Sequence, residues 1–215
     1  MIVDNEIVVS DVLFPSNNLF DIPTLDMDCQ PKSVALPFRT WGANKRSVSD
    51  SGGTLCFYVD DYRFSAIWKN PEKVLIASPQ MICEPNFSLF DSTPNAFGLY
   101  LIYKKRWLSR FYQTHNIAVF VDLHISPKFY EYNKLGVPIG YNAFSSRGHS
   151  ASLNYLQNEL QVAKEISGKD NPLMIVYGGG IRVHEFCSNN NLVYIESFIN
   201  CKNGQNIGRC AADQH

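Results

Sequence analysis

The residues best suited to chemistry are two adjacent carboxylates, Asp60 and Asp61, which follow the apolar run at residues 54–59. Two carboxylates at the end of a strand can bind Mg²⁺ or Mn²⁺, or can divide the work of general acid and general base. Side chains alternate across a strand, so only one of the two points inward, and alternation from Tyr58 favours Asp60. The structural alternative is that Asp61 caps the next turn or pairs with Arg63.

A second candidate pair is Asp122 and His124, which follow the apolar run at residues 117–121. Residues two apart share one face of a strand, so this carboxylate and this imidazole are expected side by side, as metal ligands or as an oriented base. Glu84, after another apolar run, is a candidate third carboxylate. The sequence therefore predicts a divalent metal site, for Mg²⁺ or Mn²⁺, with the ligands Asp60, Glu84, Asp122 and His124. The alternative is ordinary hydrogen bonding at strand ends, or an ordinary loop acid for Glu84.

Candidate groups for binding a substrate are Arg63, Arg106, Arg147, Gly178, Gly179 and Gly180. The glycine turn precedes a short helical pattern, so its backbone amides can approach a phosphate. Arg147 lies in a Ser/Gly-rich segment expected to be a loop, where an arginine is a suitable grip for phosphate. Arg106 is expected on a helix face opposite the apolar stripe, among aromatic and basic residues that suit nucleic-acid contact. The alternatives are a tight turn and solvated arginines.

Apolar runs and helical patterns alternate from residue 54 onward and would position these groups. Strands are predicted at residues 54–59, 81–83, 117–121, 136–144, 173–176 and 192–195. Helices are predicted over residues 97–112 and 153–163, with shorter ones at 126–134 and after residue 180. This order predicts an α/β fold, a mainly parallel sheet with right-handed βαβ crossovers, as an open sheet or a partial or distorted (β/α) barrel. Polar groups after so many strands favour the barrel, whose ligands bind at the carboxyl ends of strands.

The chain divides into three parts. Residues 1–50, with prolines and polar runs, are expected to form an irregular N-terminal wrap of extended segments and loops packed on the core, turn-like over residues 39–51. Residues 51–200 form the predicted α/β domain. Residues 201–215, rich in Gly, Asn and Gln, are expected to be a loose tail.

Composition limits the classes of function. Lys plus Arg number 19 against 20 Asp plus Glu, which does not fit a dedicated DNA-coating protein but leaves room for a local basic patch. No apolar run approaches the ~20 residues of a membrane helix, and no signal peptide is recognisable, so no membrane partner is expected. The 6 cysteines form no CxxC pair. These features predict a cytoplasmic protein in a reduced compartment.

Three motifs occur in order between residue 39 and about residue 125: Asp-Asp-Tyr-Arg-Phe at 60–64, Pro-Asn-Phe-Ser-Leu-Phe at 85–90 and Tyr-Lys-Lys-Arg-Trp-Leu at 103–108. They resemble the motifs of domain-of-unknown-function family 4417, found mostly in phages, prophages and other mobile elements. Asn86 stands where that family usually has aspartate, and residues 122–124 stand where it more often has a Pro-Thr pair and a tryptophan. The resemblance implies a mobile-element context and the cytosol of a bacterial host, and it brings no established reaction.

Three functions fit these observations. The leading hypothesis is a metal-assisted enzyme, such as a phosphodiesterase or nuclease, acting on a phosphorylated substrate such as nucleic acid or a nucleotide. The second is a non-enzymatic phage or plasmid protein that binds host machinery or DNA. The third is a replication initiator or nicking protein with a tyrosine nucleophile, Tyr103 or Tyr155.

Overall fold

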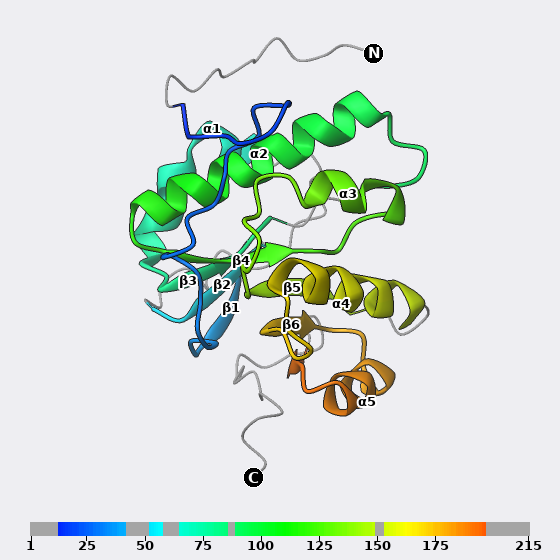
Figure 1. The fold of residues 1–215 in the computed structure, drawn as a ribbon. Coiled ribbons are helices and arrows are strands. Elements are labelled where there is room, and N and C mark those ends of the chain that lie inside the picture. Colours follow the sequence, from blue (N-terminus) through cyan, green and yellow to red (C-terminus); the bar gives the residue numbers. More distant parts are fainter. Residues whose placement is uncertain (1–12, 42–51, 58–64, 86–88, 149–152, 197–215) are drawn as a thin grey trace.

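The computed structural model describes residues 13–41, 52–57, 65–85, 89–148 and 153–196. These residues form one parallel sheet whose strands lie side by side in chain order, with helices between them (Figure 1). The strands are β1 (Phe38–Trp41), β2 (Thr54–Phe57), β3 (Met81–Cys83), β4 (Ala118–Asp122), β5 (Phe144–Arg147), β6 (Met174–Tyr177) and β7 (Val193–Ile195). Each strand neighbours the one before it in the chain, so the strand order of this sheet never reverses.

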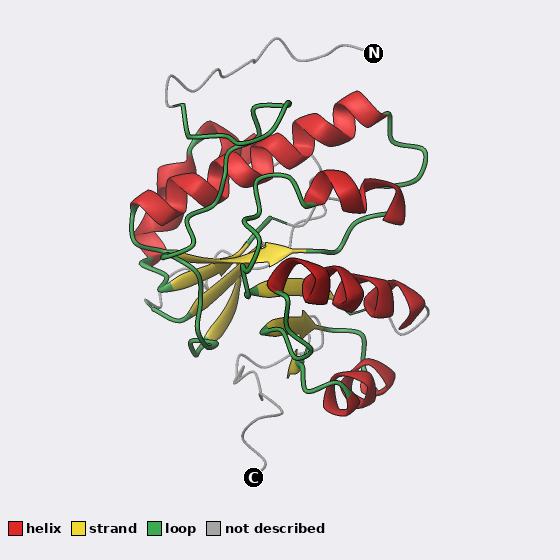
Figure 2. Cartoon of the chain, in the orientation of Figure 1, coloured by secondary structure: helices red, strands yellow, loops and turns green. Residues whose placement is uncertain are grey.

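Helices follow the strands and cover the sheet from outside (Figure 2). They are α1 (Ser65–Lys69), the 3₁₀ helix η2 (Pro71–Ala77), α2 (Asn95–Thr114), the 3₁₀ helix η3 (Pro127–Phe129), α3 (Tyr130–Asn133), α4 (Leu153–Ser167) and α5 (Ile181–Asn189). The longest, α2, buries Leu101, Ile102 and Leu108 in one cluster with Leu55 of β2 and Val119 of β4. The outer face of β2–β4 is therefore held by α2.

The sheet curls until it is nearly closed into a barrel. Because side chains alternate along each strand, Cys56, Cys83 and Phe120 face away from α2 and belong to a second buried cluster. Phe38 of β1 meets Tyr177 of β6 there, with ring centroids 6.3 Å apart, although the two strands are far apart in the sheet order. Side chains fill this interior, as in other small barrels, so the strand ends are where a ligand would bind.

The predicted parallel sheet, βαβ order and barrel-like curl are confirmed. The helix predicted over residues 153–163 is observed as α4, which extends to Ser167. Gly168 has φ of 65°, a left-handed conformation that glycine adopts readily, and its N–H donates to the Lys164 carbonyl at 2.8 Å.

Three sequence-based expectations are wrong. Residues 39–51 do not begin as a turn, because Arg39 belongs to β1, which pairs in parallel with β2. The strand predicted at residues 136–144 does not form, because Gly136 and Gly140 turn the chain with φ of 74° and 89°. β5 begins only at Phe144, so Arg147 is the last residue of a strand and does not lie in a loop.

The segment before β1 is irregular, and the last turn of α2 holds it. The side-chain oxygen of Gln113 accepts the Asp26 N–H at 2.8 Å, and its nitrogen donates to the carbonyls of Asp26 and Cys29 at 3.0 and 3.1 Å. One amide thus satisfies three backbone polar groups of Asp26 and Cys29, in a stretch without helix or strand. Across the described ranges, no helix combines the length and the apolar character that a membrane crossing requires.

Gly98 of α2 lies directly against the ring of Phe129 in η3, the element that follows β4. We expect Gly98→Ala to lower the free energy of unfolding by about 1–3 kcal/mol, because overpacking outweighs the helix preference of alanine. A Cβ atom at this position would lie 2.2 Å from Cε1 of the buried Phe129 ring. Urea unfolding measures the change. In a Phe129→Ala background the same substitution should instead stabilise the protein, and a loss there as well would contradict overpacking as the cause.

Candidate functional site

Polar side chains collect at the carboxyl ends of the central strands. Glu84 directly follows β3, Asp122 ends β4, and His124 comes two residues later. Arg147 ends β5, and the ladder pairs Asp122 with Ser145 of that strand. Because all strands run parallel, these groups lie at one edge of the sheet.

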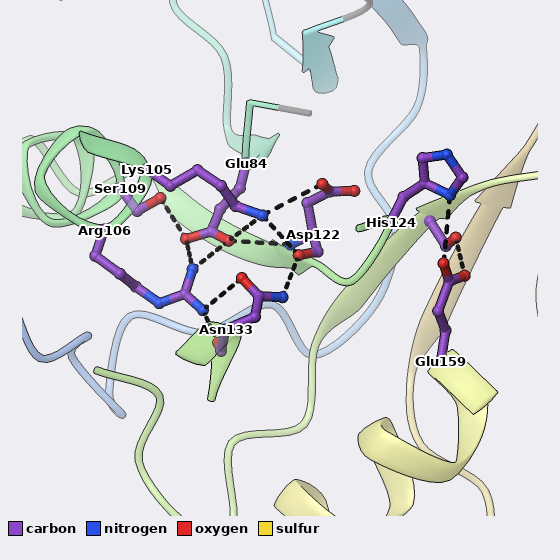
Figure 3. Close-up of polar contacts among 9 residues, drawn as sticks. Glu84, Lys105, Arg106, Ser109, Asp122, His124, Asn133 and Glu159 are labelled. Atoms are coloured by element: carbon purple, nitrogen blue, oxygen red, sulfur yellow. Dashed lines mark hydrogen bonds and ion pairs between the residues drawn. The ribbon is translucent and has the colours of Figure 1, made fainter. Parts of the chain in front are cut away.

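Glu84 is the centre of a fully buried ion pair. Arg106 Nη1 lies 2.6 and 2.5 Å from its two carboxylate oxygens, and Ser109 Oγ donates to Oε1 at 2.8 Å (Figure 3). The backbone N–H of Asp122 donates to Oε2 at 3.0 Å. Because β3 ends at Cys83, the Glu84 carboxylate accepts this hydrogen bond from β4 in place of a backbone carbonyl of β3. Burial raises the pKa of Glu84, but Arg106 and Lys105 outweigh burial and hold it below its ordinary value.

Lys105 connects α2 to the end of β4. Its Nζ donates to the Asp122 carbonyl at 2.8 Å and lies 3.3 Å from the Asp122 carboxylate, with both side chains fully buried. Asn133 of α3 donates to the same carbonyl at 2.9 Å and accepts, through its backbone carbonyl, a hydrogen bond from Arg106. Burial raises the pKa of Asp122 to about 6, against the opposing effects of Lys105 and His124. Here desolvation outweighs the ion pair, so this carboxyl titrates close to neutral pH.

His124 forms a second cluster, with Glu159 of α4 and Ser146 of β5. The imidazole is 23% exposed, and its Nδ1 lies 3.3 Å from Oε1 of Glu159, whose side chain is 1% exposed (Figure 3). Ser146 Oγ donates to the other carboxylate oxygen. Burial raises the pKa of Glu159 well above its ordinary value. Burial also lowers the pKa of His124, with Asp122 opposing and Arg147 reinforcing the shift, so both partners favour their neutral forms.

Two predicted orientations need correction. Arg106 does not lie on an outward basic face; it is fully buried, because α2 is covered by Glu84 on one side and by α3 on another. Glu84 is not a solvated loop acid, since Arg106 and Lys105 neutralise it in the interior. Arg147 is half-buried at the end of β5 and close enough to His124 to affect its pKa.

The glycine turn after β6 is a site of close backbone packing. The Gly178 N–H donates to the Ile195 carbonyl at 2.9 Å. A Cβ on Gly148 would lie 2.3 Å from the Gly178 oxygen, and one on Gly179 would lie 2.8 Å from the Gly148 carbonyl carbon. Gly180 is the N-cap of α5. The tight-turn alternative therefore accounts for Gly178 and Gly179, and phosphate binding by this turn stays a prediction.

The predicted metal ligands do not assemble within the described chain. Asp60 and Asp61, together with Arg63, lie outside the described residues. Among the residues that are described, no three His, Cys, Asp or Glu side chains are arranged to hold a metal ion. Glu84 and Asp122 face Arg106 and Lys105 instead. The described residues alone therefore form no metal site, and a site that includes Asp60 stays a prediction.

Lys105, Ser109, Asn133, Ser146 and Glu159 belong to these clusters and were not predicted from sequence. A signal existed for two of them. Glu159 falls between Leu156, Leu160 and Ala163 on the buried face of α4, and Lys105 occupies a buried position on α2. An ionisable residue at a position where helical periodicity demands an apolar one indicates a buried polar contact.

Asp122→Asn should flatten the dependence of stability on pH between about 4 and 6. The pKa of Asp122 rises from its ordinary 3.8 to about 6 on folding, so its stabilising contribution is complete below pH 3.8 and is lost as the pH rises through about 6. A shift of about two pKa units corresponds to roughly 3 kcal/mol. Urea unfolding at several pH values measures both proteins. Glu84 has the opposite effect, because its contribution to stability is lost as the pH falls, but Glu84 is present in both the parent chain and Asp122→Asn. Equal pH profiles would contradict the raised pKa.

Comparison with known proteins gives one family and two phage relatives. The family described as "Domain of unknown function (DUF4417)" matches residues 14–189. A "Gene 1 protein" of Mycobacterium phage D29 is 27% identical over 193 residues, covering 86% of this chain and 68% of the relative. A "Gene 1 protein" of Mycobacterium phage L5 is 29% identical over 173 residues, covering 77% of this chain and 74% of the relative. No solved structure shows a significant match.

Proposed function

Because the chain belongs to the DUF4417 family and resembles phage proteins over most of its length, we propose that it is a phage-type enzyme acting on a phosphorylated substrate, nucleic acid or a nucleotide. The observation that carries the proposal is the imidazole of His124. It is partly exposed at the carboxyl edge of the sheet, where the charges of Asp122 and Arg147 both act on its pKa. This edge is where barrels of parallel strands bind their ligands.

The proposed roles follow from the charges at this edge. Arg147 binds the phosphate, because a guanidinium offers two parallel N–H donors to phosphate oxygens. His124 transfers a proton to or from the substrate, as its pKa lies below the usual imidazole value and the neutral ring dominates near pH 7. Asp122 stabilises the positive charge that the ring acquires when it takes up a proton.

A panel of phosphorylated compounds tests this proposal. Nucleoside mono-, di- and triphosphates, inorganic phosphate and short single- and double-stranded oligonucleotides are added in turn, with melting temperature and ³¹P NMR as readouts. We expect at least one class to stabilise the parent chain and to be turned over. Arg147→Met should weaken its binding by roughly 10- to 100-fold, the value of a charged hydrogen bond. Arg147→Lys keeps the positive charge but loses the two parallel N–H donors, so its affinity should lie between those of the parent chain and Arg147→Met. No stabilisation by any compound would contradict the proposal.

The metal-assisted form of the proposal depends on Asp60 and Asp61, the adjacent carboxylates that lie outside the described residues. The matching measurement is a thermal-shift titration with Mg²⁺ and Mn²⁺ on the parent chain and on Asp60→Ala and Asp61→Ala. A metal at 100 times its dissociation constant adds about 2.7 kcal/mol to the free energy of unfolding. A rise that these substitutions abolish would assign the metal to this pair. If the metal does not raise the free energy of unfolding, the metal-assisted form of the proposal is rejected and the roles proposed for His124 and Arg147 remain.

A second candidate function is binding without catalysis. Two observations favour it: Glu84 and Asp122 are tied to cations inside the protein, and several large apolar side chains are exposed. Leu19 is 98%, Ile139 94% and Leu13 87% exposed. If the phosphorylated panel gives nothing, Leu19→Asp and Ile139→Asp should each reduce binding to DNA or to a purified host protein without lowering the melting temperature.

The tyrosine-nucleophile hypothesis now favours one residue. Tyr103 packs against the buried cluster under α2, on the outer face of the sheet. Tyr155 is 46% exposed on α4, one helical turn before Glu159, which contacts His124. Any covalent DNA adduct should therefore disappear in Tyr155→Phe and persist in Tyr103→Phe.

A further inference from the structure

Glu159 is a buried carboxyl on a helix face that is otherwise apolar. Its neighbours on that face of α4, Leu156, Leu160 and Ala163, are all buried. In the described chain its ion-pair contact is the imidazole of His124, with no lysine or arginine in salt-bridge contact. Burying a carboxyl without a strong cation costs free energy, and an apolar side chain of similar size would cost less. Fold stability alone does not explain this residue.

The two oxygens of Glu159 have different surroundings. Oε2 accepts the hydroxyl proton of Ser146, which fixes the carboxyl on β5. Oε1 lies 3.3 Å from Nδ1 of His124 and has no hydrogen-bond partner among the described residues. A small rotation of the partly exposed ring would complete this bond. The carboxyl is thus held on one side and aimed at the imidazole on the other (Figure 3).

We propose that Glu159 is a positioning residue that donates a hydrogen bond from Oε1 to Nδ1 of His124, so that Nε2 carries the ring proton and is presented at the carboxyl edge of the sheet. A bond at one imidazole nitrogen fixes both the tautomer and the ring orientation. The pKa directions support the neutral pair, since burial raises that of Glu159 and lowers that of His124. Asp122, Lys105 and Arg147 also act on His124, and their charges partly cancel.

This arrangement turns His124 into a proton donor at a pH where an isolated imidazole is mostly neutral. Nε2 gives its proton to the leaving oxygen of the substrate, and Nδ1 takes up the proton of Glu159. The carboxylate that remains accepts a hydrogen bond from Ser146. The pair has then lost one proton, which the leaving oxygen holds, and taking up one proton from solvent restores the neutral pair. This relay rests on the proposed function, whereas the tautomer exists with or without a substrate.

The test is ¹⁵N NMR of the histidine rings in the full chain without ligand, near pH 7. We expect His124 to be protonated at Nε2 with a hydrogen-bonded, unprotonated Nδ1. His115 is an internal standard for the opposite tautomer, because its Nδ1 lies 2.9 Å from the Phe111 carbonyl, which can only accept. A protonated Nδ1 on His124 in the parent chain would overturn the proposal.

Two substitutions separate positioning from packing. Glu159→Gln keeps a donor for Nδ1, since Ser146 holds the amide oxygen, and should keep the His124 signature while losing turnover. Glu159→Leu should be at least as stable as the parent chain, and its Nδ1 resonance should move to that of a free nitrogen. An unchanged Nδ1 resonance in Glu159→Leu would overturn the proposal. If Glu159→Leu does not fold, Ser146→Ala is measured in its place and should shift the Nδ1 resonance of His124. An unchanged resonance in Ser146→Ala would also overturn the proposal. Failure of every phosphorylated substrate would leave these NMR results intact, so the two proposals fail separately.

Discussion

Arg106→Met is expected to lower the free energy of unfolding by about 3–5 kcal/mol, the largest stability loss we predict for this chain. Removing one partner of a buried ion pair leaves the other charge in the interior without compensation. Here the stranded group is Glu84, which is fully buried and would keep only Lys105, 3.9 Å away, as a cation. The hydrogen bonds of Arg106 to Leu135 and Asn133 would be lost as well. Urea unfolding followed by circular dichroism measures the loss.

Arg110→Met is the matched control, because it makes the same change one turn later on α2. Arg110 pairs with Asp26 at 3.3 Å, and both side chains are partly exposed. Such a pair contributes at most about 1 kcal/mol. Comparable losses in the two variants would contradict the buried ion pair. The double variant Glu84→Gln/Arg106→Met should lose less free energy of unfolding than the two single variants combined. Removing both partners of the ion pair leaves neither charge uncompensated.

His124→Gln should reduce turnover of the phosphorylated substrate by about 10²- to 10⁴-fold, the range for loss of a positioned proton-transfer group. Binding should change little, because Arg147 is proposed to hold the phosphate. Glutamine retains polar contacts near Glu159 but cannot carry a proton between two atoms. Single-turnover kinetics together with a separate binding measurement distinguish the two effects.

His115→Gln is the control for this prediction. His115 follows α2 and is exposed, with Nδ1 close to the carbonyl of Phe111. Its replacement should leave turnover unchanged. A fall in substrate affinity as large as the fall in turnover would argue that His124 binds substrate and does not transfer a proton.

The architecture was predictable because it depends on repeated local patterns. Apolar runs alternating with amphipathic stretches can bury both kinds of element only in a covered parallel sheet, and polar residues after the strands marked its functional edge. The strand predicted at residues 136–144 failed for a local reason, since the left-handed conformations of Gly136 and Gly140 break an otherwise apolar segment.

The site was only partly predictable, because its polar contacts join residues that are distant in sequence. The spacing of Asp122 and His124 identified one strand end, but nothing in that segment indicates Lys105 or Glu159 as partners. Arg106 lies off the apolar stripe of its helix, which predicts an outward face suited to nucleic-acid contact. α2 is covered beyond that stripe, however, and Arg106, which faces Glu84 and Asn133, is as buried as Leu108 of the same helix.

The unbroken strand order also bears on how the chain acquires its structure. Every strand joins one that has already left the ribosome, so successive βα units can add to a growing sheet, each by a short loop closure. The contact between Phe38 and Tyr177 is different, because it links β1 with β6. It can form only after most of the chain has been synthesised. Curling of the sheet, and with it the final geometry of the carboxyl edge, should therefore be a late event in folding, separable in pulse-labelling hydrogen exchange from the earlier protection of β2–β4.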